Sequence, residues 1–292
     1  MSAALEVRDL RMRFGAQAAI DGISFRLEPG RIHGLLGRNG AGKTTLLSLV
    51  ASLRRPTSGS IRIDGVDPFG IAAAAAKVCL VPSGPELSGG LRVRAALKAA
   101  AALRPNWDAA LAERLVGRFA LPMKKTIASL SRGQRSAVGI VIGLASRAEL
   151  TMFDEAYLGL DAPSRYAFYE ELLQDYMAHP RTIVLSTHLI EEVGDLFEDV
   201  LILKDGRVLL QENAEQLRSR GAALVGPADK VDAVVAGLNV VGSRSLGPTK
   251  SVTVYGNAID GLHRRAGEAG LQVAPVPLQD LFVHLTEPGA AS

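Results

Sequence analysis

The stretch GRNGAGKT at residues 37–44 decides the fold, because it matches the phosphate-loop pattern G-x-x-x-x-G-K-[ST]. The apolar run at 32–36 precedes it and predicts a strand, and the pattern then changes to that of a helix over 38–53. The apolar face predicted for this helix carries Leu46, Leu47, Val50 and Leu53. A strand, a glycine-rich turn and a helix in this order direct backbone N–H groups and the positive end of the helix dipole at one anion. The alternative is a glycine-rich turn before an ordinary helix. A second motif is needed to distinguish this turn from a phosphate-binding loop.

Each position of this loop has an expected role toward a triphosphate. The three glycines let the backbone pass close to the phosphates, where a Cβ would collide. Lys43 would place a positive charge on the β- and γ-phosphates, and the hydroxyl of Thr44 would bind Mg²⁺. Lys43 is therefore also a candidate catalytic residue. The candidate nucleotide-binding residues of the loop are Gly37, Arg38, Asn39, Gly40, Ala41, Gly42, Lys43, Thr44 and Thr45.

A pair of carboxylates supplies the second motif. In LTMFDE at 150–155, apolar residues lead into Asp154 and Glu155, which places both acids at the carboxyl end of a predicted core strand. Ligands of open α/β sheets bind at that edge. We expect Asp154 to hold Mg²⁺ and Glu155 to act as the general base for a water that attacks the γ-phosphate. An isolated acidic pair would more often cap the following helix, but the phosphate loop favours the catalytic interpretation.

These motifs, over about residues 4–217, resemble the ATP-binding cassette (ABC) ATPases, the nucleotide-binding subunits of membrane transporters. By this resemblance, Phe14 stacks on adenine, LSRGQ at 130–134 is the signature, Asp161 belongs to the D-loop and His188 is the switch histidine. The resemblance implies an α/β fold with a P-loop NTPase core: a RecA-like sheet, an antiparallel β subdomain and a helical subdomain. It also implies hydrolysis of ATP to ADP and phosphate, with Mg²⁺ as cofactor.

Two segments compete for the role of the signature. ELSGGL at 86–91 and LSRGQ each match it imperfectly, and in the family the signature opens a helix that leads directly to the acidic strand. LSRGQ is followed by the apolar run 137–146 and then by Asp154, whereas Ser88 is much farther away, so we interpret ELSGGL as a glycine-rich loop. The resemblance then places four residues on the γ-phosphate of an ATP held by a second subunit, in a head-to-tail dimer. They are Ser131, Arg132, Gly133 and Gln134. A serine that merely caps a helix is the alternative.

Two positions depart from the family pattern. Arg132 replaces the first glycine of the signature, and we expect the site still to close because arginine suits phosphate and Gly133 keeps the close approach. Ser83 stands where the family has the Q-loop glutamine, and its shorter side chain cannot span the same gap. The hypothesis is that hydrolysis survives but is slow, or that water fills the gap.

Composition sets limits on the rest. The chain has 292 residues and a formal net charge of +3, which allows one large domain with an appendage, or two moderate domains, and implies no nucleic-acid surface. A lone cysteine, Cys79, fits a reducing cytoplasm. The charged N-terminus lacks a signal core, and the run 137–146 is too short to span a bilayer, so we expect membrane association through a partner. No Cys/His spacing suggests zinc, and surface or packing roles are expected for His33, His179, His263 and His284.

The pattern of elements divides the chain in two. Short strands at 4–37, with Asp-Gly and Pro-Gly as reversals, are followed by an Ala-, Leu- and Arg-rich helical subdomain at about 84–149. Apolar runs at 150–155, 182–187 and 200–204 then predict a parallel sheet, which an Asp-Gly hairpin closes. We expect an ATPase domain at 1–217 and an accessory lobe at 218–292. The lobe's predicted order, βαββαβ plus a terminal helix, suggests a ferredoxin-like fold.

Three functions are compatible with the sequence. The first is a transporter ATPase of the bacterial drug- or antimicrobial-exporter branch, located in the cytoplasm at the inner face of the cell membrane through an integral membrane permease. The resemblance implies that the helical subdomain docks that permease, whereas the run Arg92, Arg94, Lys98 and Arg104 is most simply a solvated helix face. The second is a regulatory ATP-binding module with little turnover because of Ser83 and Arg132. The third, a cassette protein acting on ribosomes or DNA, is disfavoured because such relatives usually carry two cassettes or a long coiled coil, and this chain has neither.

Overall fold

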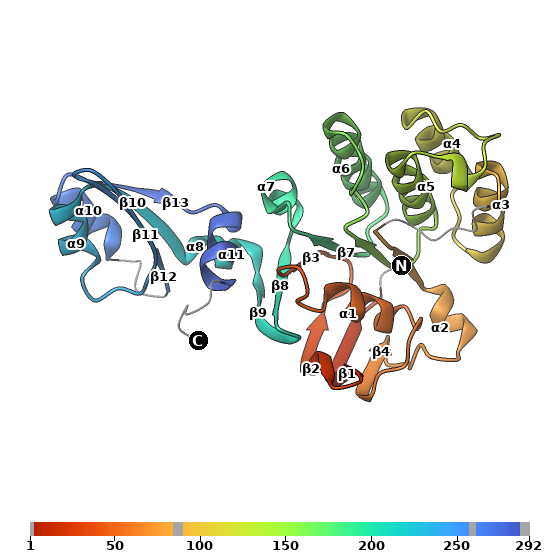
Figure 1. Cartoon of the computed structure of the whole chain (residues 1–292), viewed down its shortest axis with the longest axis horizontal. Helices are drawn as coiled ribbons and strands as arrows, with labels where there is room; N and C mark the ends of the chain where they lie inside the picture. Colours follow the sequence, from red (N-terminus) through yellow and green to blue (C-terminus); the bar gives the residue numbers. More distant parts are fainter. Residues whose placement is uncertain (1–2, 84–89, 257–260, 287–292) are drawn as a thin grey trace. The chain divides into compact units, whose positions relative to one another are not determined.

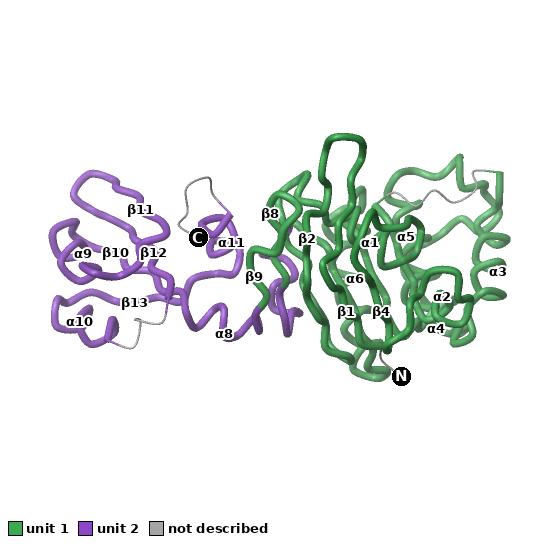
Figure 2. The backbone as a smooth tube through the Cα atoms, turned by 90° about the horizontal axis from the view of Figure 1, so that it is seen from below, with its two compact units in different colours: residues 1–188, 201–211 green, residues 189–200, 212–292 purple. Residues whose placement is uncertain are grey.

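The computed structural model describes residues 3–83, 90–256 and 261–286. The loop ELSGGL, with Ser88, lies largely outside these residues. The chain forms two compact units: unit 1 is 1–188 with 201–211, and unit 2 is 189–200 with 212–292 (Figure 2). Unit 2 thus contains residues 189–200 in addition to the C-terminal region, because α11 (Leu278–Thr286) packs against α7 (Ile190–Val193).

A six-stranded sheet forms the centre of unit 1, in the order β5-β6-β7-β3-β8-β9 (Figure 1). Neighbours among the first four strands pair in parallel. Every residue of β3, β6 and β7 is buried, which explains the apolar runs within them and confirms the predicted core strands. The bounds are β3 Ile32–Leu36, β5 Val78–Val81, β6 Leu150–Asp154, β7 Thr182–Thr187, β8 Asp199–Lys204 and β9 Arg207–Asn213.

A three-stranded antiparallel sheet, in the order β2-β1-β4, forms the second layer. Its strands are β1 (Leu5–Phe14), β2 (Gln17–Leu27) and β4 (Ser58–Ile63). The prediction of a reversal at Asp21–Gly22 was wrong, because Gly22 lies within β2 at a φ of +70°, where the register with β1 shifts. Such a shift with a left-handed glycine is a β-bulge. The predicted Asp205–Gly206 turn does join β8 to β9, with both residues at positive φ.

Helix α1 (Lys43–Val50) is shorter than the predicted 38–53. Gly40 and Gly42 have φ of +84° and +104°, which keeps the loop out of helical conformation until Lys43, and Ser52 turns the chain at a φ of +58°. Leu53 is consequently 69% exposed rather than buried, whereas the other three predicted residues are buried.

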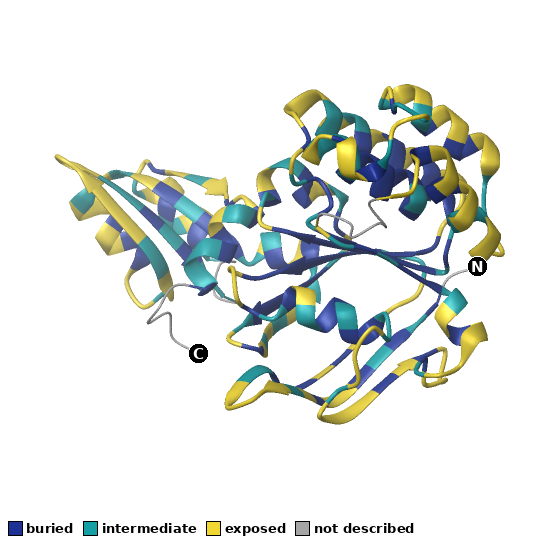
Figure 3. Cartoon of the chain, turned by 45° about the vertical axis from the view of Figure 1, so that its right-hand side comes forward, coloured by how far each residue is buried: buried dark blue, intermediate teal, exposed yellow. Residues whose placement is uncertain are grey.

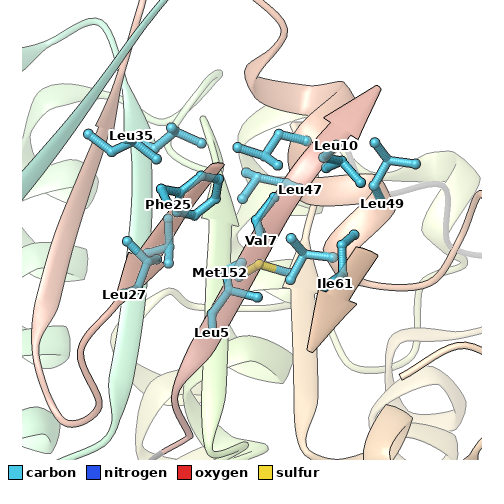
Figure 4. Close-up of a cluster of buried hydrophobic side chains, with 14 of the residues drawn as sticks. Leu5, Val7, Leu10, Phe25, Leu27, Leu35, Leu47, Leu49, Ile61 and Met152 are labelled. Atoms are coloured by element: carbon cyan, nitrogen blue, oxygen red, sulfur yellow. The ribbon is translucent and has the colours of Figure 1, made fainter. Parts of the chain in front are cut away.

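The main core of unit 1 joins α1, the antiparallel sheet and one face of the parallel sheet. Side chains from β1, β2 and β4 meet Leu47 and Leu49 of α1 and Met152 of β6 (Figure 4). These apolar side chains are almost fully excluded from water, and their burial is the main favourable term in the stability of the layer. Cys79 is buried in β5, as the apolar run predicts.

Helices cover the other face of the parallel sheet (Figure 1). They are α3 (Val93–Leu103), α4 (Ala109–Arg118), α5 (Arg132–Ala145) and α6 (Ala162–Ala178), and the short α2 (Ala72–Ala76) precedes β5. The buried sides of these helices face inward (Figure 3), and α3 and α4 pack against α5. Helix α5 packs closely on β5 and β6, because a Cβ on Gly143 would lie 2.5 Å from Val81 Cγ2 and 2.7 Å from Phe153 Cε1. Among the helices of the described segments, none combines the length and apolarity that a bilayer crossing requires.

Unit 2 contains a four-stranded antiparallel sheet in the order β11-β12-β10-β13. Its elements confirm the predicted βαββαβ order with a terminal helix, and this strand order is that of a ferredoxin-like sheet. Apolar residues of its strands and helices form a separate core. The bounds are α8 Ala214–Ser219, β10 Gly221–Pro227, α9 Ala228–Val235, β11 Val240–Leu246, β12 Thr249–Tyr255, α10 Leu262–Glu268 and β13 Gln272–Pro275.

A chain of ion pairs fixes α6 and β7 to the helical subdomain. Arg181 and Asp175 are each about 98% buried and lie 2.7 Å apart. Arg147 lies 3.1 Å from Asp175 and 2.8 Å from Asp108, the residue that caps α4. A buried charge is tolerable only when it is paired, so Asp175 is the acceptor on which Arg181 depends.

We expect Asp175→Ala to lower the free energy of unfolding by about 3–5 kcal/mol, because it leaves the Arg181 guanidinium buried without its carboxylate. Urea denaturation measures this loss. The control is Glu170→Ala on the same helix, which breaks a pair that Glu170 makes with Arg118 at the surface and should cost at most about 1 kcal/mol. Equal losses of unfolding free energy in the two variants would contradict the conclusion that buried Arg181 depends on Asp175.

Candidate functional site

The phosphate loop packs against two other segments of the chain. A Cβ on Gly42 would lie 2.7 Å from the Ala19 carbonyl oxygen, and one on Gly37 would lie 2.8 Å from that of Leu203. The N–H of Gly206, in the turn between β8 and β9, donates to the carbonyl of Ala41 at 3.1 Å. These contacts leave no room for side chains at the two glycines, so the loop backbone itself forms the cradle.

Lys43 lies at the centre of this cradle. Its side chain is 6% exposed, and Nζ donates to the carbonyl oxygens of Gly37 at 2.7 Å and Arg38 at 3.4 Å. The same Nζ lies 3.6 Å from Glu155 Oε1. The loop cation and the carboxylate that follows β6 therefore face each other.

Thr44 and Asp154 form a hydrogen-bonded pair. Thr44 Oγ1 donates to Asp154 Oδ2 at 2.7 Å, and Asp154 is 2% exposed. In the described part of the chain, the other oxygen, Oδ1, is buried and has no hydrogen-bond partner. A buried carboxylate oxygen without a donor is costly, and a hydroxyl beside a carboxylate offers the oxygen ligands that Mg²⁺ prefers. The residues present thus fit a magnesium ion.

Glu155 occupies a strained position directly after β6. Its φ is +47°, in the left-handed region that a non-glycine residue seldom adopts, and its N–H donates to Ser186 O on β7 at 3.1 Å. Its Oε1 lies 3.3 Å from Nδ1 of His188, which follows β7. The adjacent ends of two parallel strands therefore bring the predicted base and the predicted switch histidine together.

Two adjoining cavities surround the phosphate loop, Asp154 and Glu155. One, of about 620 Å³, is lined by Asn39 to Thr45, Glu155 and the turn at Asp205 and Gly206. The other, of about 910 Å³, is lined by Thr44, Asp154, Ser83 and the start of α1. Phe14 lines both. The structure thus places Phe14 and the substituted position Ser83 beside the phosphate loop.

The sequence analysis missed two contributors to this site. The Arg54 guanidinium carbon lies 5.5 Å from the centroid of the Phe14 ring, within cation–π range, and no motif singles it out. The turn at Asp205–Gly206 was predicted as a hairpin but not as a wall of the nucleotide cavity. Only the fold brings these residues, remote in sequence, to the loop.

The signature residues lie elsewhere in the unit. Ser131 Oγ accepts the Gln134 N–H, and Gln134 Oε1 accepts the Ser131 N–H, which forms a capping box at the start of α5. A Cβ on Gly133 would lie 2.5 Å from Gly159 O, so the signature packs against the loop that contains Asp161. None of these residues, nor the exposed Arg132, lines either cavity described above.

Asp161 caps α6. Its carboxylate accepts the Ser164 N–H at 3.0 Å, and hydrogen bonds from Ser164 hold the pKa of Asp161 below its ordinary value. Ser131 and Asp161 therefore both cap helices, which is the alternative role considered for Ser131, and a capping role does not preclude contacts with a second subunit.

A strand, a loop cradle containing a lysine, and a facing pair of carboxylates define a P-loop nucleotide-binding protein. The model of the ABC transporter family matches residues 20–158. The NatA ABC transporter ATP-binding protein of Bacillus subtilis is 33% identical over 208 residues, which cover 68% of this chain and 83% of that protein. The chain belongs to the ABC transporter family, as an ATP-binding subunit that hydrolyses ATP to drive transport.

Two further comparisons extend this result. The daunorubicin resistance ATP-binding protein DrrA3 of Streptomyces coeruleorubidus is 28% identical over 308 residues, covering 97% of this chain and 96% of that protein. A solved ATP-binding subunit of an ABC transporter superposes with a TM-score of 0.66 at 29% identity, covering 74% of this chain and 92% of that one. The predicted fold class and ATPase activity are therefore confirmed.

We expect Gly42→Ala to weaken ATP binding at least about tenfold, because the new Cβ would lie 2.7 Å from Ala19 O and would displace the cradle. Titration calorimetry with ATP measures this. Gly65→Ala is the matched control: Gly65 also has a positive φ, at +80°, but a Cβ there meets nothing within 4 Å. It should lose stability from backbone strain, about 1–2 kcal/mol, and keep its ATP affinity. Similar affinities in the two variants would contradict this account of the loop.

Proposed function

We propose that this chain energises an exporter by acting on a separate integral membrane permease. The similarity to the daunorubicin resistance protein carries this proposal, because that alignment runs over 97% of the chain and so includes unit 2. A Nod factor export ATP-binding protein of Ralstonia nicotianae is also 31% identical, over 73% of the chain. An aliphatic sulfonates import protein is 32% identical over 77% of the chain, so similarity over the ATPase region alone does not distinguish export from import. The proposed location is the cytoplasmic face of the membrane, through the permease.

The proposed active assembly contains two ATPase subunits. The signature residues lie outside both cavities that contain the phosphate loop, and Ser131 and Arg132 are exposed, which suits contact with an ATP held by another chain. A solved ABC cassette dimer bound to ADP and Pi shares the fold, at 20% identity and a TM-score of 0.64. The partner subunit would be a second copy or a related chain.

In the proposed complex, the loop N–H groups and Lys43 bind the β- and γ-phosphates, and Phe14 stacks on adenine. Thr44 and Asp154 would hold Mg²⁺, with the buried Asp154 Oδ1 as a ligand that nothing else in the described residues engages. When bound, the ion would neutralise charge that develops on the phosphates.

Glu155 is the proposed general base. Its carboxylate accepts a proton from the attacking water while the water oxygen bonds to the γ-phosphorus, and the bond from that phosphorus to the bridging oxygen breaks to release ADP. Lys43 Nζ, 3.6 Å from Glu155 Oε1, would face the transferred group. His188 would contact the γ-phosphate from the end of β7.

A regulatory role with slow turnover is the second candidate, and Ser83 favours it. Ser83 is exposed at the wall of the larger cavity, beyond the end of β5, where a longer glutamine could reach toward Asp154. The short hydroxyl leaves that space open to water. Steady-state turnover distinguishes a slow ATPase from an efficient one.

We propose that a basic surface on the helical subdomain docks an acidic cytoplasmic segment of the permease. A cavity of about 310 Å³ is lined by Ala95, Met123 and four cationic side chains. They are Arg92, Arg94, Lys98 and Lys124. No ion pair to any of them occurs within the described residues. Arg104, predicted on the same face, instead donates to the Val78 carbonyl at 2.6 Å.

The test of the proposed chemistry is Glu155→Gln. We expect steady-state ATP hydrolysis to fall about 100-fold or more while ATP affinity is retained, because the amide cannot accept the water's proton. Phosphate release and titration calorimetry measure the two quantities. A wild-type rate no higher than that of the variant would instead support the regulatory module.

Arg132→Gly tests the substituted signature. We expect ATP-dependent dimerisation, measured by sedimentation in the Glu155→Gln background, to change less than about threefold, because Gly133 preserves the close approach and arginine suits phosphate. Strongly improved dimerisation in the glycine variant would show that Arg132 is a defect.

Charge reversal tests the docking surface. Lys98→Glu combined with Lys124→Glu should reduce co-purification of the permease at least about fivefold, since two cations become anions facing an acidic segment. Arg62→Glu, an exposed position on β4, is the matched surface control and should retain the permease. If the double variant still co-purifies with the permease, this surface is ruled out as the docking site.

A further inference from the structure

The turn at Asp205–Gly206 lies between the phosphate loop and β2. The Gly206 N–H donates to Ala41 O at 3.1 Å, and the Gly206 carbonyl accepts the N–H of Asp21, on β2, at 2.8 Å. A Cβ on Gly206 would lie 2.8 Å from Ala19 O, so the turn is in close contact with β2. Backbone hydrogen bonds through Gly206 therefore connect β2 to the phosphate loop.

The side chain of Asp21 reinforces this connection. Arg207, the first residue of β9, donates to Asp21 Oδ2 from Nε at 3.1 Å and from Nη2 at 2.6 Å. Oδ1 accepts from Arg11, which pairs with Asp21 across β1 and β2. The hydrogen bond from Arg207 holds the pKa of Asp21 below its ordinary value, so the carboxylate is charged at neutral pH. Asp21 thus joins the antiparallel sheet to the residue that directly follows the turn.

The position of this turn depends on contacts outside its own sheet. Strand β9 is the last strand in the order of the six-stranded sheet, and a hairpin at a sheet edge opens more readily than a central strand. Arg207 contacts β2 directly after the turn, through Asp21. Gln211 contacts β2 farther along β9, by donating to the Arg26 carbonyl. Of these two contacts, the one made by Arg207 adjoins the turn.

The segments that Asp21 connects are walls of one cavity. Residues 17–19, the loop residues 39–45 and the turn all line the cavity of about 620 Å³. Asp21 is not among its lining residues. Its carboxylate would therefore act on a bound nucleotide through the turn and the loop, and not by contact.

We propose that Asp21 is a positioning residue for ATP binding: with Arg207 it holds the turn at Asp205–Gly206 against Ala41, and this contact fixes the shape of the phosphate loop. The inference rests on the proposed role of the loop in ATP binding and on none of the proposed catalytic residues. If Asp21 only stabilised the antiparallel sheet, its pair with Arg11 would matter as much as its pair with Arg207. Variants of the two arginines therefore separate positioning from sheet stability.

Asp21→Ala and Arg207→Ala test the proposal on the full chain. Each should weaken ATP affinity about three- to fivefold in titration calorimetry, the size that a partly exposed ion pair allows. The kcat at saturating ATP should stay within about twofold of wild type, because binding is lost equally in the ground state and the transition state. Since the Arg207 side chain is 72% exposed, Arg207→Ala should fold even if Asp21→Ala does not.

Two matched controls come from neighbouring contacts. Arg11→Ala removes the other partner of the same carboxylate, within the antiparallel sheet. Gln211→Ala removes a hydrogen bond between the same two strands, β9 and β2, away from the turn. Both should keep ATP affinity within about 1.5-fold of wild type.

A double-mutant cycle tests whether Asp21 acts through Arg207. The ATP affinity of Asp21→Ala/Arg207→Ala should match that of the weaker single variant within about 1.5-fold, whereas independent effects would multiply. Multiplied losses, unchanged affinity in both single variants, or an equal loss in Arg11→Ala would overturn the inference while the proposed function stands. A wild-type chain without ATP affinity would overturn the proposed role of the loop, and the inference with it.

Exchange of the Gly206 amide hydrogen gives a readout that does not depend on nucleotide. Its hydrogen bond to Ala41 O should open more often when the turn is released. We expect exchange of this hydrogen, measured by NMR, to be about three- to tenfold faster in Asp21→Ala and in Arg207→Ala, and unchanged in Arg11→Ala. Equal exchange rates in all four proteins would contradict the proposal.

Discussion

The hydrogen bond between Thr44 and Asp154, 2.7 Å long, is the contact on which the rest of the site depends. It joins the start of α1 to the end of β6, and it can form because β3, β7 and β6 pair in parallel with their carboxyl ends at one edge. In this register Leu36 pairs with Thr187 and Asp154 pairs with Ser186. One edge therefore presents the phosphate loop, Asp154, Glu155 and His188.

The glycines and the strained residue of this edge have a common physical cause. The loop must pass within contact distance of the carbonyls of Ala19 and Leu203, so Gly42 and Gly37 cannot carry a Cβ. Glu155 must leave β6 sharply to face Lys43, and its left-handed φ is the local cost of that turn. The packed core of α1 and the two sheets holds both features in place.

The sequence predicted the parts of the fold that local pattern controls. Buried parallel strands give uninterrupted apolar runs, so β3, β6 and β7 were found with their bounds nearly correct, and the phosphate loop and Asp154 followed from them. Predictions from local pattern failed where pairing with another strand determines the backbone conformation. Asp21–Gly22 has the composition of a turn but forms a bulge, because β1 imposes the register. The contact between Arg54 and Phe14 could not be predicted, since no spacing in the sequence shows which remote residue a side chain meets.

The central claim is that the loop before α1 and the Asp154 carboxylate together form a site for a magnesium-bound adenine nucleotide. Titration calorimetry of the purified wild-type chain with ATP, in the presence of Mg²⁺ and then of a chelator, tests it most directly. Saturable binding of ATP at one site per chain, weakened when the metal is removed, is the result that this account predicts. Affinity for adenine nucleotides that is absent, or that is unaffected by Mg²⁺, would contradict it.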